Sequence, residues 1–150
     1  MSTIKVDTYL TRGGASEIAI DKLKGASSAS SISVVGEGGS TTTNLQQGLA
    51  KAWFTMDGTG TVGVVDSFNI GGITDEGTGD YSHTYSSNLG TAEHPIAGSI
   101  IGSLESNFFS FVSSTGTSQA TTGDAFQMIH HTGATNDQDP VHIIVNGDLA

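Results

Sequence analysis

From Ala50 onward, apolar and polar residues alternate with a period of two, and glycine-rich turns interrupt this pattern at short intervals. Successive side chains of a β-strand point to opposite faces, so the period indicates strands with one buried face. Short strands separated by such turns are typical of an all-β sandwich or barrel. The segments that follow the pattern are Ala50–Met56, Thr61–Val65, Ser67–Ile73, Tyr81–Tyr85, Ile96–Leu104, Asn107–Val112, Ala125–His131 and Val141–Val145.

We therefore expect residues 50–150 to form a β-sandwich or jelly-roll-like domain. Its core should contain Trp53, Phe68 and one face of the strand that carries Phe109 and Phe111. The last strand, Val141–Val145, is partly apolar on both faces, as a central strand or a strand between subunits would be.

Residues 1–24 lack the regular turn spacing of the later chain. Met1–Tyr9 has the alternation of a strand. Ser16–Leu23 fits either a short strand or two helical turns, and Ile18 with Ile20 favours the strand. We expect residues 1–24 to be an extended segment that attaches the domain to a larger structure.

Residues 25–49 look like a spacer. Gly25–Thr43 is rich in glycine, serine and threonine, and only Ile32, Val34 and Val35 are able to pack. Such a composition behaves as a flexible linker, or else as a thin strand stacked between identical chains. Thr43 with Gln46 is a weak capping-box pattern, which predicts one or two helical turns up to Ala50.

The basic residues end close to the expected domain boundary at residue 50. All five basic residues lie at or before Lys51, and the rest of the chain carries carboxylates without any lysine or arginine. Nothing in that part can replace the counterions of a nucleic acid or bind an anionic membrane surface. No apolar run reaches the ~20 residues of a membrane span. We expect no nucleic-acid partner and no membrane insertion.

Sites for chemistry are weakly indicated. His130 and His131 are neighbours on a strand and point to opposite faces, so they cannot chelate one ion within a chain. The acidic turns Asp75–Asp80 and Asn136–Asp139 offer oxygen ligands but match no calcium loop. Solvated turn carboxylates are the favoured interpretation, and we expect no metal and no cofactor.

Neither catalysis nor sugar binding has a clear signature. The chain has no cysteine and no esterase-type serine elbow, so we expect no enzyme. Trp53, Tyr81, Tyr85 and Phe126 are the rings able to stack on sugars, but core positions are favoured for them.

One stretch resembles a known module. The residues KAW at 51–53, GTGTV at 58–62, SFNI at 67–70 and ITDEGTGDY at 73–81 resemble a module of tail-fibre-like virion proteins of bacteriophages, especially marine ones. The opening MSTIKVDT is similar to the start of such proteins.

The resemblance implies a virion structural protein, a homotrimer held to other virion proteins through its N-terminal segment. It would be a tail fibre or fibre-like component that contributes to host attachment, with a surface glycan or another receptor as a further partner. A head decoration protein is the first alternative. A carbohydrate-binding β-domain is the second.

Overall fold

The computed structural model describes residues 21–25, 32–36, 38–101, 107–110, 119–130 and 132–149, without side chains for residues 47 and 107–110. Its elements are β1 (Ser33–Val35), β2 (Thr42–Asn44), α1 (Leu45–Gly48), β3 (Ala50–Asp57), β4 (Gly63–Phe68), β5 (Ile70–Gly77), β6 (Asp80–Tyr85), β7 (Ile96–Ile100), β8 (Asn107–Ser110), β9 (Gln119–Ala120), β10 (Gly123–His130) and β11 (Val141–Asn146).

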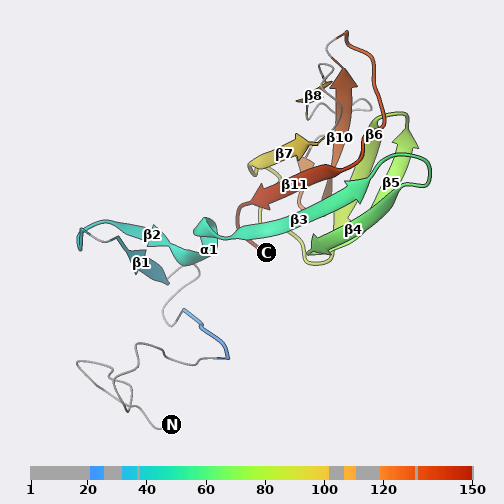
Figure 1. Ribbon diagram of the computed structural model, residues 1–150. Coiled ribbons are helices and arrows are strands. Elements are labelled where there is room, and N and C mark those ends of the chain that lie inside the picture. Colours follow the sequence, from blue (N-terminus) through green and yellow to red (C-terminus); the bar gives the residue numbers. More distant parts are fainter. Residues whose placement is uncertain are drawn as a thin grey trace, which may run out of the picture.

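Two antiparallel sheets pack face to face in a sandwich (Figure 1). The first sheet has the strand order β4-β3-β11-β7. The second has the order β5-β6-β10-β8, and β9 also pairs with β10. The all-β, sandwich-like fold predicted from the alternation is thereby confirmed, and β11 occupies the central position that its two partly apolar faces indicated.

The core lies between the two sheets. Phe54 on β3 and Phe126 on β10 meet across it, with ring centroids 6.0 Å apart. Fully burying a side chain of this kind contributes roughly 1.5–3 kcal/mol, so a few such residues dominate the stability of a small sandwich. The buried apolar residues are Ala52, Phe54, Met56, Tyr81, Tyr85, Leu89, Phe126, Met128, Val141, Ile143 and Val145.

Two residues expected in the core lie outside it. Ala52, Phe54 and Met56 fill the inner face of β3, so the alternation turns Trp53 to the outer face, where it is partly exposed. Phe68 pairs directly with Trp53, shares that face and is 50% exposed. The prediction of a core position was wrong for both, because the two-residue period shows that a strand has a buried face but the register decides which of its residues occupy that face. The side chain of Phe109 and all of Phe111 lie outside the described residues.

Strands β4 and β5 are separated at Asn69, not at Asp66 as the pattern suggested. Asn69 has a φ of 59°, which asparagine tolerates better than most residues. Its side-chain amide donates to the carbonyl oxygens of Lys51 and Ser87, both at 3.0 Å, and its amide oxygen accepts from the Ser87 N–H. These bonds fix the point where the chain passes from one sheet to the other.

The acidic turn after β5 is shorter than predicted. β5 runs through Gly77, so Asp75 and Glu76 are strand residues, and only Thr78 and Gly79 make the turn. Gly79 has a φ of 65°, and a Cβ there would lie 2.5 Å from the backbone nitrogen of Asn136. The close approach of residues 132–140 to this turn therefore requires glycine.

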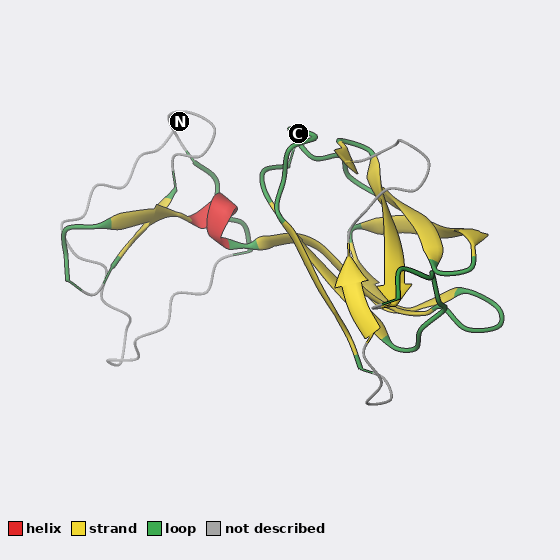
Figure 2. Ribbon diagram, turned by 90° about the horizontal axis from the view of Figure 1, so that it is seen from above, coloured by secondary structure: helices red, strands yellow, loops and turns green. Residues whose placement is uncertain are grey.

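The N-terminal third is described only in part. The predicted strand Met1–Tyr9 lies outside the described residues, as does most of Ser16–Leu23, whose last residues form no strand. Within Gly25–Thr43, β1 pairs with β2 as an antiparallel hairpin, and the predicted helical turn is α1. Figures 1 and 2 both show this hairpin beyond the end of the sandwich, joined to it through α1 and β3.

Candidate functional site: an exposed apolar row, a projecting hairpin and a buried polar cluster

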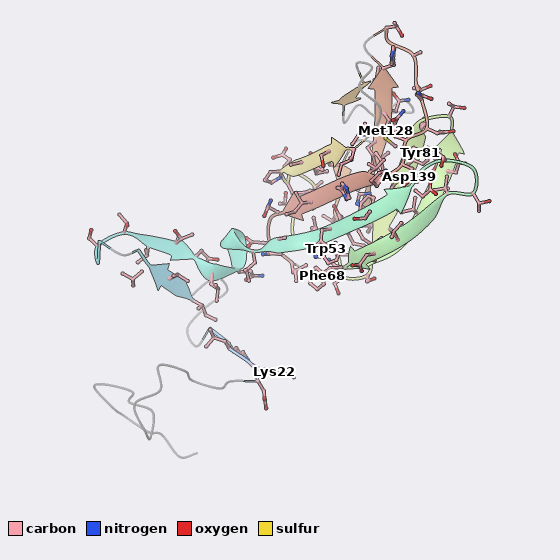
Figure 3. The ribbon with its side chains drawn as sticks, in the orientation of Figure 1. Lys22, Trp53, Phe68, Tyr81, Met128 and Asp139 are labelled. Atoms are coloured by element: carbon pink, nitrogen blue, oxygen red, sulfur yellow. The ribbon has the colours of Figure 1, made fainter. Side chains whose placement is uncertain are left out.

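The outer face of the first sheet carries one continuous apolar row across its four strands. Phe68 on β4 pairs with Trp53 on β3, Trp53 pairs with Ile144 on β11, and Ile144 pairs with Ala97 on β7. Phe68 is 50% and Ile144 is 41% exposed. Figure 3 shows Trp53 and Phe68 next to each other. We call these four residues the outer row.

A polar row runs beside it on the same face. Thr55 pairs with Asp66 on β4 and with His142 on β11, and His142 pairs with Ser99 on β7. A hydrogen bond of 3.0 Å joins the Thr55 hydroxyl to Nδ1 of His142. The outer face therefore combines an apolar strip with an edge of hydrogen-bonding groups, which is the composition of many protein interfaces.

The β1–β2 hairpin leaves its apolar side chains uncovered. Val34 is 50% and Val35 is 57% exposed, and Ile32, just before β1, is partly exposed. The three residues expected to take part in assembly thus lie on one small ribbon. A two-stranded hairpin is marginally stable on its own, so this ribbon needs another surface to pack on.

Lys51 ties the hairpin to the sandwich. It is 4% exposed, and its ammonium donates to the carbonyl oxygen of Leu49, just after α1, at 2.7 Å and to that of Gln46 within α1. Burial lowers the pKa of Lys51, and the negative charge of Asp148 opposes this. Cations are favourable at the C-terminal end of a helix, where carbonyl groups have no helical partner.

A buried polar cluster lies on the inner face of the second sheet. The Asp124 carboxylate on β10 accepts a hydrogen bond from the Tyr85 hydroxyl, and its Oδ2 lies 3.0 Å from Nε2 of His94 and 3.5 Å from Nε2 of His83. The side chains of Asp124 and both histidines are at most 1% exposed. Burial, then the hydrogen bond to Asp124 and its charge, raise the pKa of Tyr85.

His83 is the unusual member of this cluster. Its ring packs against Phe54, with centroids 5.0 Å apart, and edge-on against Tyr85 at 5.1 Å. Neither ring nitrogen makes a hydrogen bond among the described residues. Burial lowers the pKa of His83 to about 4, although the nearby Asp124 carboxylate favours the charged form. His83 is therefore neutral at neutral pH.

The cluster joins segments that are distant in sequence. Nδ1 of His94 lies 3.2 Å from the carbonyl oxygen of Thr91. The backbone carbonyl of His94 accepts a hydrogen bond of 2.6 Å from the side-chain amide of Gln119. The backbone N–H of Ala120 donates to Asp124 Oδ1. These bonds attach the segment before β7 and strand β9 to the core. The cluster therefore holds the interior of the sandwich together, and its Asp124, His83 and His94 side chains are closed to solvent.

The structure separates the other residues considered from the sequence. His130 lies at the end of β10, where Nδ1 is 2.8 Å from the Thr132 hydroxyl, and His131 is outside the described residues. Tyr81, Tyr85 and Phe126 are buried, so of the four rings considered for sugar stacking only Trp53 reaches the surface. Within the described ranges, no group of three or more histidine, cysteine, aspartate or glutamate residues is arranged to hold a metal ion.

Sequence reasoning missed the buried cluster. The pattern Tyr81-x-His83-x-Tyr85 places the histidine on the same strand face as two tyrosines that were themselves expected in the core. That signal identifies His83 as buried, whereas its proximity to Asp124 and His94 depends on strand pairing across the fold.

No protein-family model, curated protein or solved structure matches the chain. Among the described residues, no helix is long and apolar enough to cross a membrane.

Proposed function

We propose that this chain is a structural subunit that assembles with copies of itself, as a homotrimeric tail fibre or fibre-like component of a bacteriophage particle. In this role it projects from the particle and contributes to host attachment. The observation that supports self-assembly best is the β1–β2 hairpin, whose Val34 and Val35 side chains are half-exposed or more.

The physical reason is the cost of ordering the hairpin. Each residue loses roughly 1–2 kcal/mol of backbone entropy, and a ribbon that exposes Val34 and Val35 recovers little of this by burial. A neighbouring chain that covers these residues supplies the missing burial. Closed cyclic symmetry is the usual result for identical chains, and the fibre-like resemblance favours three.

The charge division supports an attached, projecting subunit. The basic residues all lie in the N-terminal part, and the acidic remainder repels other acidic surfaces and keeps the projecting part soluble. Under this proposal residues 1–24 bind other virion proteins, and the sandwich faces outward.

Sedimentation equilibrium of the full-length protein at micromolar concentration tests the proposal. We expect a mass of three chains. A single-chain mass contradicts self-assembly and favours the free carbohydrate-binding domain, whereas a dimer contradicts the fibre assignment.

Labelling the protein in intact particles separates the two virion roles. Label on the tail agrees with a fibre component, and label spread over the head identifies a decoration protein. Removing residues 1–24 should leave a folded sandwich that no longer enters particles, and normal incorporation of that variant would show that attachment occurs elsewhere.

A further inference from the structure

Two uncovered apolar surfaces occur on the same chain: the outer row of the first sheet and the valine side chains of the β1–β2 hairpin. We propose that the hairpin of one chain packs on the outer row of a neighbouring copy. This inference rests on the proposed self-assembly and names the contact that produces it.

The hairpin does not cover its own outer row. Both views place it beyond the end of the sandwich (Figures 1 and 2), and Lys51 holds α1 there through the carbonyl oxygens of Gln46 and Leu49. Phe68 and Ile144 consequently keep 50% and 41% of their surface exposed within the single chain. A second copy is able to bring its own hairpin to this face.

The distribution of charge favours the hairpin of a neighbouring chain, and not its sandwich, as the segment that covers the outer row. Residues 32–36 and 38–44 carry no charged side chain, and Glu37 between them is the one carboxylate of the segment, so the hairpin brings a single negative charge toward the acidic part of a neighbour. Two sandwiches docked through their outer faces would instead bring Asp66 of each toward an acidic surface that has no lysine or arginine beyond Lys51. Like charges brought together in this way oppose association.

The polar edges of the two surfaces also fit each other. Val34 and Val35 point to opposite faces of the hairpin, Val34 beside Thr43 and Val35 beside Thr42, so either face offers a valine with a threonine hydroxyl next to it. The outer row is bordered by Thr55 and His142. An apolar centre with a hydrogen-bonding rim is the usual composition of a specific interface.

The contact has a definite symmetry. The hairpin and the outer row are different surfaces, so the contact is heterologous, with each chain giving its hairpin to the next. Such a contact closes into a ring when the rotation between copies allows it, and a three-membered ring is the closed form that agrees with the proposed trimer.

Trp53 makes this testable, because it is the only tryptophan of the chain and lies in the outer row. Acrylamide quenching of its fluorescence should be measured on the full-length protein, alongside sedimentation velocity. We expect the wild type to be several-fold less quenchable than a V34S/V35S variant, which should sediment as a single chain.

The matched control is Val65→Ser, since Val65 is 67% exposed on β4 but is not part of the outer row. It should behave as the wild type in both measurements. As a second variant, Phe68→Ser should reproduce the dissociation from the acceptor side. The circular dichroism spectra of all variants should match, because none of these side chains is in the core.

The outcomes are distinguishable. A trimer whose Trp53 is as accessible as in V34S/V35S overturns the hairpin contact and leaves self-assembly intact. A single chain at every concentration overturns both. If Trp53 is shielded only after a neutral oligosaccharide is added, the outer row is a sugar-binding surface and the proposed contact is wrong.

Discussion

Nε2 of His83 lies 3.5 Å from Oδ2 of Asp124 in the interior of the sandwich, yet neither nitrogen of that imidazole makes a hydrogen bond among the described residues. The ring is enclosed by Phe54, Tyr85 and Phe126, with His94 and Asp124 as the nearest titratable neighbours besides the Tyr85 hydroxyl. A buried imidazole without a hydrogen-bond partner costs much less free energy when it is neutral than when it is charged.

The stability of the sandwich should therefore fall in mild acid. Burial lowers the pKa of His83 to about 4 from its usual 6.5, so the unfolded chain takes up a proton at higher pH than the folded one. The stabilisation is complete above pH 6.5 and is lost as the pH falls toward 4. From a difference of this size we expect a loss of about 2–3 kcal/mol by pH 4.5, measured by urea unfolding.

The control for this prediction is His83→Phe, which keeps an aromatic ring between Phe54 and Tyr85 and removes the titrating group. Carboxylates with ordinary pKa values contribute little between pH 6.5 and 5. The unfolding free energy of His83→Phe should be nearly constant over that interval. A variant that keeps the wild-type slope would assign the acid sensitivity to another group.

Removing the shared acceptor of the cluster should be far more damaging. Asp124→Ala leaves the Tyr85 hydroxyl without its acceptor and His94 without its carboxylate, in a site closed to water. Breaking a buried charged network by removing one partner costs about 3–5 kcal/mol. Thermal unfolding of Asp124→Ala should show a large drop in Tm, whereas the exposed Glu93→Gln should leave Tm within a degree or two of the wild type.

The sequence predicted those parts of the fold that depend on local pattern. β3, β6 and β11 lie where the alternation placed them, because an inward-facing apolar set cannot slip by one residue without exposing itself. The helical turn after Thr43 was also predicted correctly.

The parts that it missed depend on partners far away in the chain. Trp53 was expected in the core because it stands in the apolar start of a strand, but the neighbouring Phe54 points into the core and so turns Trp53 outward. The end of β4 is set by the bonds of Asn69 to Lys51 and Ser87. No local pattern contains these contacts.

Of the two candidate surfaces, the hairpin was predictable from local sequence and the outer row was not. Val34 and Val35 were singled out from composition alone, since little else in their segment is apolar. The outer row required knowledge of the register, because Phe68, Ile144 and Ala97 come into one row with Trp53 only through the pairing of four strands.

Tyr81 should hold residues 132–140 against the sandwich. Its hydroxyl donates to Asp137 Oδ1 at 2.7 Å and lies 3.0 Å from the carbonyl oxygen of Gly58, and Asp137 also accepts from the Gly79 N–H at 2.6 Å. Burial, followed by the bond to Asp137 and its charge, raises the pKa of Tyr81, so the hydroxyl remains a donor well above pH 10.

Tyr81→Phe removes this donor and keeps the buried ring. We expect a loss of about 1.5–3 kcal/mol in unfolding free energy, typical of a hydrogen bond to a charged group. Amide hydrogen exchange should also become faster in residues 132–139 than in β3. Equal exchange in the wild type and the variant would mean that the remaining bonds, among them Gly79 N–H to Asp137 and Gly58 N–H to the Gln138 carbonyl, hold the segment without Tyr81.

Gly123, the first residue of β10, should tolerate no side chain at all. A Cβ at this position would lie 2.0 Å from the carbonyl oxygen of His83 and 3.0 Å from the Cα of Thr84, both backbone atoms of the paired strand β6. Neither atom can move without opening the β6–β10 pairing beside the polar cluster, so Gly123→Ala should lose at least about 3 kcal/mol. The matched substitution is Gly63→Ala at the first position of β4, where the nearest atom to a Cβ is 4.0 Å away. Urea unfolding should find Gly63→Ala within about 1 kcal/mol of the wild type. Similar losses for the two alanine variants would show that the strands do not approach as closely at Gly123 as the register indicates.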